Sequence, residues 1–246
     1  MKKTLASFSI AALASLACGV QAQAVLAVST WLPPAHPATL AQKDWCDLVS
    51  NNSQGRIKCN YLPRAVSAPP GTFDAVKNGQ ADLSYTVHGY TPGRFLLTQM
   101  AEFPFLGNSA ETISVAYSRV SAKYPEFNNE HQGVKVLTLW AHGPGIVFNT
   151  KHAISKIDEL QGLKFRIGGG MVNEITKSLG MNVTLKPATD SYELLSSGVM
   201  DGTLLPAEST ESFKIDKIIK HATTFPGGLY NTSFVFMMNQ GKYDKL

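Results

Sequence analysis

The chain has 246 residues, a formal net charge of +4 and 44% hydrophobic residues, which is enough material for two modest globular lobes. The weak net charge argues against nucleic-acid binding, which needs a clustered basic face. After the first 24 residues, no apolar segment is long enough to span a membrane.

The N-terminus has the pattern of a secretory signal peptide, expected over residues 1–24. Two lysines precede an uncharged apolar run over residues 5–20, and Ala22 and Ala24 both offer cleavage sites. Removal of these two lysines lowers the charge of +4 to about +2. Cys18 stands in a weak lipobox, so a lipid anchor is the alternative interpretation. The signal peptide predicts export to the periplasm.

Two cysteines remain in the exported chain, Cys46 and Cys59. An exported protein with two cysteines is expected to form one disulfide. The alternative is a pair of buried free thiols, because a helix-to-strand bridge requires close Cα atoms.

The first half of the chain predicts alternating strands and helices. Strands are expected over residues 25–30, 56–62, 81–87 and 134–141, and helices over residues 39–52, 73–78 and 111–126. The proline-rich segment 31–37 is expected to form a rigid loop, since residues that precede proline are extended.

The second half continues in the same way. Strands are expected over residues 146–149, 163–167, 182–185 and 233–239, and helices over residues 171–179 and 206–213. Extended segments over residues 134–149 and 230–239 are expected to join two lobes.

A sequence motif occurs twice, over residues 73–82 and 192–201. An aromatic residue, a branched apolar residue, a glycine and an aspartate recur at identical spacing, and a Gly–strand–Pro block precedes each copy. Chance recurrence of α/β patterns is the alternative, but two matched blocks in one order favour a duplication. Two similar lobes would leave a ligand cleft between them. Asp82 and Asp201, at equivalent places, are expected to accept backbone N–H bonds near the hinge.

Arg166 is the strongest candidate for contact with an anion. It ends an expected strand, and the glycine turn 168–170, with Gly169 at its centre, leads directly into a helix. Free N–H groups at a helix start and a planar guanidinium both favour a carboxylate. The alternative is a surface arginine paired with an acid. The sequence lacks the features of either nucleotide-binding fingerprint.

Aromatic and histidine side chains gather near the expected strand ends. The candidates for ligand contact are Trp31, Tyr90, Trp140, His36, His88 and His142. For any one of them a place in the core is the alternative. No paired His/Cys spacing or HExxH motif predicts a metal, and no GxSxG motif predicts a nucleophile. Glu130-His131 is an isolated acid–histidine pair in a polar loop.

The chain resembles the extracytoplasmic solute-binding subunits of TRAP transporters, the DctP family. The matching segments are Gly55–Lys58, Ala75–Asp82, Gly89–Arg94, Phe103–Leu106, Leu160–Arg166 and Tyr192–Gly202. They cover nearly the whole exported chain in the order of the family.

This resemblance implies an α/β, two-lobed periplasmic binding protein of the Venus-flytrap type, with a cleft between lobes joined by crossing strands. Lobe I is expected over residues 25–141 plus 234–246, and lobe II over residues 142–233. The resemblance further implies a monomer without cofactor that closes on a small organic acid and delivers it to a TRAP membrane permease. Arg166 matches the family arginine that forms a salt bridge with the ligand carboxylate.

Departures from relatives that bind sialic acid point to a different ligand. A second arginine is replaced by Gly145, an asparagine by Leu205, a pocket aromatic by Ala188 and an acidic residue by Val87. The acid and tryptophan of metal-using members are also absent. The resemblance therefore implies an apolar pocket with one cation, which fits a monocarboxylate with a hydrophobic or lightly hydroxylated tail, bound without metal.

Family members usually continue well past the strand 233–239, whereas this sequence stops at Leu246. A truncated reading frame is the favoured interpretation, and a reduced family member is the alternative. Apart from a transport receptor, three further hypotheses are an exported α/β hydrolase, a periplasmic sensor subunit for the same ligand, and an inactive fragment. The absence of a nucleophile–base signature disfavours the hydrolase.

Overall fold

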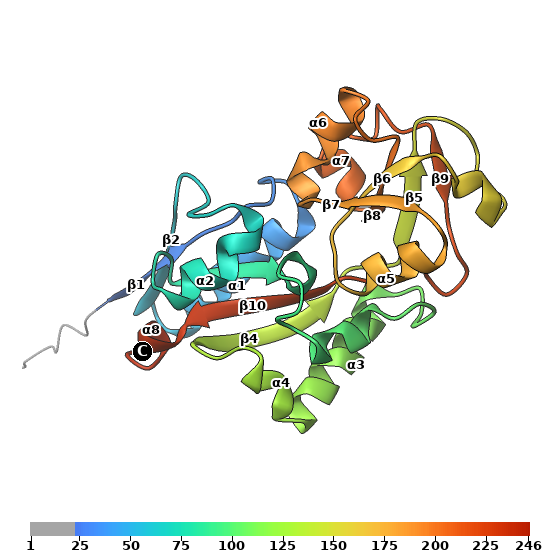
Figure 1. Ribbon diagram of the computed structural model, residues 1–246. Coiled ribbons are helices and arrows are strands. Elements are labelled where there is room, and N and C mark those ends of the chain that lie inside the picture. Colours follow the sequence, from blue (N-terminus) through green and yellow to red (C-terminus); the bar gives the residue numbers. More distant parts are fainter. Residues whose placement is uncertain (1–22) are drawn as a thin grey trace, which may run out of the picture.

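The computed structural model describes residues 23–246 and arranges them in two α/β lobes around two five-stranded sheets (Figure 1). The strand orders are β2-β1-β3-β10-β4 in lobe I and β7-β6-β8-β5-β9 in lobe II. Most of the expected signal peptide lies outside the described residues, and Ala24 is the first residue of β1. Within residues 23–246, no helix has the length and apolar character needed to cross a membrane.

Lobe I contains elements from both ends of the described chain. Its strands are β1 (Ala24–Val28), β2 (Ile57–Tyr61), β3 (Leu83–Val87), β4 (Val134–Ala141) and β10 (Ser233–Asn239). Its α-helices are α1 (Pro37–Asn52), α2 (Thr72–Lys77), α3 (Ala110–Lys123), α4 (Glu126–Asn129) and α8 (Gln240–Tyr243), and its 3₁₀ helices are η1 (Pro69–Gly71), η2 (His88–Tyr90) and η3 (Leu97–Glu102).

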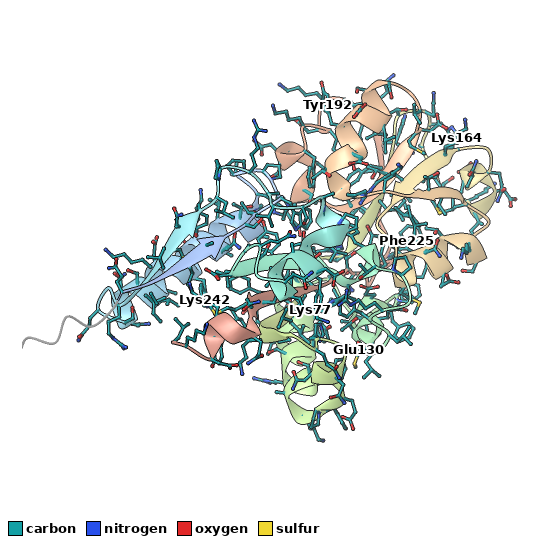
Figure 2. All side chains as sticks on the ribbon, turned by 60° about the vertical axis from the view of Figure 1, so that its left-hand side comes forward. Lys77, Glu130, Lys164, Tyr192, Phe225 and Lys242 are labelled. Carbon is teal, nitrogen blue, oxygen red and sulfur yellow. A yellow bond between two sulfur atoms is a disulfide. The ribbon has the colours of Figure 1, made fainter. Side chains whose placement is uncertain are left out.

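Lobe II is formed by the middle of the chain and carries the side chains of Lys164, Tyr192 and Phe225 that are labelled in Figure 2. Its strands are β5 (Gly145–Asn149), β6 (Lys164–Ile167), β7 (Asn182–Leu185), β8 (Gly202–Pro206) and β9 (His221–Thr223). Its α-helices are α5 (Met171–Ser178), α6 (Ser191–Ser196) and α7 (Ser209–Ser212), and its 3₁₀ helices are η4 (Ile157–Leu160) and η5 (Ala188–Asp190).

The two sheets share one topology, as the repeated sequence motif predicts. In lobe I, β1 lies between β2 and β3 and runs parallel to both, and in lobe II β6 lies between β7 and β8 in the same way. The Asp82 carboxylate accepts the Ala27 N–H at 2.8 Å, and the Asp201 carboxylate accepts the Lys164 N–H at 2.9 Å. Both aspartates have the expected structural role. They lie at the starts of β3 and β8, however, so the expected place near the hinge is wrong.

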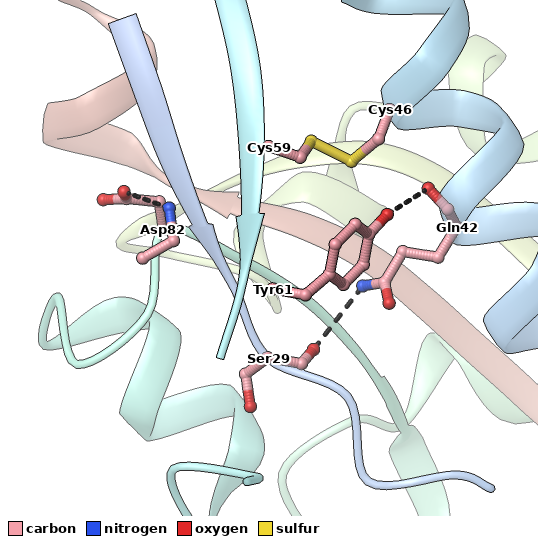
Figure 3. The surroundings of a disulfide bond; sticks show 7 residues. Ser29, Gln42, Cys46, Cys59, Tyr61 and Asp82 are labelled. Carbon is pink, nitrogen blue, oxygen red and sulfur yellow. Dashed lines mark hydrogen bonds between the residues drawn. A yellow bond between two sulfur atoms is a disulfide. The ribbon is translucent and has the colours of Figure 1, made fainter. Parts of the chain in front are cut away.

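Cys46 of α1 and Cys59 of β2 form a disulfide with a Cα–Cα distance of 5.9 Å (Figure 3). This bridge holds α1 against the sheet. Next to it, the Tyr61 hydroxyl donates to the Gln42 carbonyl, and the Gln42 amide donates to the Ser29 carbonyl at 3.5 Å (Figure 3). The middle of α1 is therefore held against the sheet at Gln42 and at Cys46.

Two extended crossings join the lobes, as expected. The first leads from β4 through residues 142–144 into β5, and the second leads through residues 230–232 into β10. They pair with each other, since the Gly145 N–H donates to the Tyr230 carbonyl at 2.8 Å. In Figure 1, β10 runs from this crossing into lobe I, where it lies between β3 and β4.

Prolines explain two differences from the expected elements. Helix α1 begins at Pro37, two residues early, because His36 accepts the Ala38 N–H as a cap and proline suits the first helical turn. The helix expected from Pro206 is wrong there. Pro206 is the last residue of β8, and α7 spans only Ser209–Ser212. The short edge strand β9 has no clear signal in the sequence.

Candidate ligand-binding cavity

A cavity of about 470 Å³ lies between the lobes. Val87 of β3 and Phe234 of β10 line it from lobe I, whereas Arg166 of β6 and Leu205 of β8 line it from lobe II. Its size is typical of a small-molecule site. A ligand in this cavity would contact both lobes.

Arg166 provides a buried positive charge in this wall. Its side chain is 2% exposed, and it donates from Nε to the Lys186 carbonyl at 2.8 Å and from Nη1 to the Leu204 carbonyl at 3.3 Å. A guanidinium has five N–H groups, so donors remain for a ligand. No carboxylate within residues 23–246 lies within 4.0 Å of this guanidinium. Because a buried charge is costly without a counter-ion, the site favours an anion.

Aromatic side chains form much of the remaining wall. The rings of Trp140 and Phe234 stack with centroids 4.0 Å apart, and Trp31 packs against Tyr90 at 5.7 Å. The Tyr90 hydroxyl accepts the Ala188 N–H at 2.9 Å and so links the two lobes. Tyr230 covers Gly145, where a Cβ would collide with the ring. The space beside Gly145, the residue expected to replace the second arginine of relatives that bind sialic acid, is thus occupied by the Tyr230 ring.

Two histidines lie in the cavity wall in neutral form. Burial lowers the pKa of His142, although a hydrogen bond to the Gly143 carbonyl and the charge of Glu208 oppose this shift. Burial also lowers the pKa of His36, against the opposing charge of Glu208. His36 Nε2 lies 3.2 Å from the Ser209 hydroxyl in lobe II. Both imidazoles are therefore uncharged at neutral pH and contribute hydrogen-bonding groups rather than cations.

Glu208 is the acidic residue in the wall, and it is not among the site residues expected from the sequence. It precedes α7, its side chain is exposed, and within residues 23–246 that side chain has no hydrogen bond or ion pair. Arg166 and Glu208 are the charged residues among those that line the cavity. The cavity therefore has a cation in its buried wall and an anion on an exposed side chain.

Most of the sequence-predicted site residues lie together in this wall. They are Arg166, Trp31, His36, Val87, Tyr90, His142, Ala188 and Leu205. His88 and Gly169 lie outside it. His88 is buried beside Ser233 and His131, and the backbone of Gly169 packs against that of Gly89 in lobe I. The close approach of the two lobe backbones therefore explains why a glycine stands at position 169, and a contact with ligand does not.

Several wall residues were not in the predicted set. Tyr230, Phe213 and Phe234 line the cavity, but in the sequence they resemble ordinary core residues of strands and helices. Glu208 had a usable signal, because it follows a strand end on the cleft side of lobe II. Among residues 23–246, no group of three or more His, Cys, Asp or Glu residues is placed to hold a metal ion.

Comparison with known proteins places the chain among bacterial binding proteins. Residues 28–246 match the family model DctP, described as bacterial extracellular solute-binding protein, family 7. A curated relative is the outer membrane transporter protein TsaT of Comamonas testosteroni. It is 30% identical over 239 residues, which cover 96% of this chain and 71% of the relative.

Solved structures of TRAP solute-binding proteins are also similar to this chain. A TRAP periplasmic solute-binding protein of Bordetella bronchiseptica with bound mandelate has a TM-score of 0.88 and 44% identity, covering 90% of this chain and 71% of that one. A TRAP solute-binding protein of Rhodoferax ferrireducens with copurified benzoate has a TM-score of 0.85 and 30% identity, covering 91% and 71%. A marine metagenome protein with 3-hydroxybenzoate has a TM-score of 0.86 and 32% identity, covering 92% and 71%.

The chain spans 63% and 59% of the length of two further curated relatives, from Haemophilus influenzae and Verminephrobacter eiseniae. The similar structures are binding proteins of TRAP transporters and not enzymes, which rules against the hydrolase hypothesis. Members of this family are typically periplasmic. The two-lobed α/β fold, the interlobe cavity and the family match lead to one conclusion: the chain belongs to the DctP family of bacterial extracellular solute-binding proteins.

Proposed function

We propose that this protein is the periplasmic solute receptor of a TRAP transporter and that it binds an aromatic monocarboxylate between its lobes. The carboxylate forms a salt bridge with Arg166, and the receptor delivers the ligand to the membrane permease. The supporting observation is the buried Arg166 guanidinium, which has no carboxylate partner within residues 23–246 and faces an aromatic cavity.

The aromatic class is supported by the cavity walls and by the relatives. Trp31, Trp140 and Phe234 offer ring faces to a ligand, and similar proteins hold mandelate, 3-hydroxybenzoate and benzoate. A sugar acid fits poorly. Its hydroxyls would face Val87 and Leu205, which have no hydrogen-bonding side chains, and each buried unpaired hydroxyl costs about 1–3 kcal/mol.

Binding is expected to favour the closed arrangement of the lobes. Arg166 holds the carboxylate from lobe II, whereas Trp31 and Trp140 pack on the ring from lobe I. A ligand that contacts both walls stabilises the arrangement that brings them together and shifts the population toward it.

The direct test is a thermal-shift screen of the exported chain with benzoate, mandelate and 3-hydroxybenzoate. Galactonate, succinate and an amino acid serve as comparison ligands. Aromatic monocarboxylates are expected to raise the melting temperature once the ligand concentration exceeds Kd. At a ligand concentration of 100 Kd the folded state gains about 2.7 kcal/mol of stability. A cooperative melt that moves only with galactonate or succinate would contradict the proposed ligand class.

Glu208 is expected to discriminate against a second negative charge on the ligand. A dicarboxylate held by Arg166 would bring its other carboxylate toward this acid. Glu208→Gln should therefore improve phthalate binding relative to benzoate by roughly fivefold, because one exposed like-charge contact costs roughly 1 kcal/mol. Isothermal titration calorimetry gives the ratio.

The matched control is Glu211→Gln, an exposed acid on α7 that does not line the cavity. The control should leave the phthalate-to-benzoate ratio unchanged. An equal ratio in wild type and Glu208→Gln would show that Glu208 has no part in selecting ligand charge.

A further inference from the structure

A chain of buried polar groups, none of which lines the ligand cavity, joins the two lobes. Glu102, the last residue of η3, is 1% exposed. Its Oε2 accepts the Met171 N–H of α5 at 2.9 Å, and its Oε1 accepts the Ser233 N–H of β10 at 2.9 Å. One carboxyl group thus contacts lobe I, a crossing strand and the first turn of a lobe II helix.

The chain continues from Ser233 into lobe I. The Ser233 hydroxyl lies 2.7 Å from Glu102 Oε1 and 2.9 Å from His88 Nδ1. His88 Nε2 then lies 2.9 Å from His131 Nε2, and His131 Nδ1 lies 2.7 Å from the Phe127 carbonyl. We call this sequence of groups, Glu102–Ser233–His88–His131, the joint network.

The number of hydrogens in the joint network follows from its geometry. The Phe127 carbonyl can only accept, so His131 Nδ1 must carry a hydrogen. Each of the three remaining contacts, from His131 to His88, from His88 to Ser233 and from Ser233 to Glu102, also needs one hydrogen between its two atoms. An ionised carboxylate, one hydroxyl and two neutral imidazoles supply one hydrogen fewer than these contacts require.

We propose that the joint network is a proton-binding site, which from neutral pH up to pH 8 holds one proton more than ionised Glu102 and two neutral histidines would carry. Its ligand is a proton shared along the chain, and the network titrates as one unit. Burial raises the pKa of Glu102 and lowers the pKa values of His88 and His131, which favours the proton on the carboxyl group. Loss of this proton leaves one contact of the joint without a hydrogen.

The charged and titratable groups that face the network do not remove this requirement. Tyr117 of α3 and Tyr230 face Glu102, and burial raises the pKa values of both phenols, so they remain neutral. Glu130 and Arg94 face His131 with opposite charges and have opposite effects on its pKa. Glu130, Arg94 and Tyr230 form no hydrogen bond with a side chain of the network. The neutral Tyr117 phenol lies near the Ser233 hydroxyl, and a contact there leaves the number of hydrogens required by the other contacts unchanged.

The sign of the pH effect follows from the ordinary pKa values, 4.5 for Glu102 and 6.5 for the histidines. At pH 8 the unfolded chain has ionised carboxylates and neutral imidazoles, so unfolding releases the network proton. Because the folded state binds more protons, stability falls as pH rises, with a tenfold change in the unfolding constant per pH unit. This dependence ends above the folded-state pKa of the network.

Calorimetric unfolding at pH 8 in phosphate and in Tris, which differ in ionisation enthalpy, counts the released protons. Wild type should release one proton more than Glu102→Gln, since the Gln side chain cannot bind or release a proton. The Gln amide can donate to the Ser233 hydroxyl, but it then leaves the Ser233 N–H without its acceptor, so this variant is expected to be less stable than wild type. The control is Glu159→Gln, another carboxylate that accepts backbone N–H bonds but lies in an exposed turn. It should release as many protons as wild type. Equal release from wild type and Glu102→Gln overturns the proposal.

A measurement on wild type alone decides the matter if Glu102→Gln does not fold. Nitrogen and carbon NMR of the folded protein at pH 8 identify which imidazole nitrogens carry hydrogen and whether the Glu102 carboxyl group is protonated. The proposal requires either a protonated Glu102 or one imidazole with hydrogen on both nitrogens, together with a hydrogen between the Nε2 atoms of His88 and His131. An ionised Glu102 beside two neutral imidazoles would overturn it.

Discussion

Arg166→Ala is expected to weaken binding of an aromatic carboxylate by about 30-fold or more. Removing one partner of a buried charge pair costs about 2–5 kcal/mol, and each 1.4 kcal/mol is about tenfold in affinity. Arg166 is 2% exposed, so water cannot replace the lost partner of the ligand carboxylate. Isothermal titration with benzoate measures the loss directly.

Two further variants separate loss of the anchor from loss of the fold. Arg166→Lys keeps the charge but loses the planar fork, so its affinity should fall between those of wild type and Arg166→Ala. Arg119→Ala removes an exposed arginine of α3 outside the cavity and should bind as wild type does. If folded Arg166→Ala binds benzoate within about threefold of wild type, the anchor assignment is wrong.

Removing the disulfide by the double substitution Cys46→Ala and Cys59→Ala is expected to cost about 3 kcal/mol of stability. The two cysteines are 13 residues apart in sequence, and a cross-link over such a loop restricts the unfolded chain by about that free energy. For a protein of this size the melting temperature should fall by roughly 6–12 °C. Thermal unfolding followed by circular dichroism gives the shift.

Reduction of the wild-type protein provides the internal control for this prediction. Dithiothreitol should lower the wild-type melting temperature toward that of the double variant and leave the double variant unchanged. A double variant that melts with the oxidised wild type would mean that the bridge contributes nothing measurable. Because Trp45, next to Cys46, lines the cavity, the same samples also show whether the bridge supports ligand binding.

The sequence predicted the shared topology of the two sheets because helix, glycine and strand recur in the same order around residues 73–82 and 192–201. It also placed Arg166 correctly at the end of β6, since a short apolar run followed by glycines has few other interpretations. In both cases the local pattern determines the structure, and contacts from distant parts of the chain are not needed.

Contacts between distant segments could not be read from local patterns. His88 follows a strand end just as His142 does, yet it points into the joint network because Ser233, far along the chain, lies beside it. Phe234 belongs to an apolar strand with a buried appearance, and only the pairing of β10 with β4 places its ring in the cavity beside Trp140. Glu208 differs from these two residues, because its place just after the end of β8 was a usable signal for a position in the cleft.

The position of β10 has a consequence for the order in which the molecule can fold. In the described part of the chain, β10 is the only sheet partner of β4, and it also supplies one neighbour of β3. The strands of lobe II, by contrast, all come from one continuous stretch of chain between β4 and β10. Contacts so distant in sequence form slowly because a long loop must close first. Lobe II can therefore fold early, whereas the sheet of lobe I remains divided, with β4 unpaired and prone to aggregation, until residues 233–239 arrive.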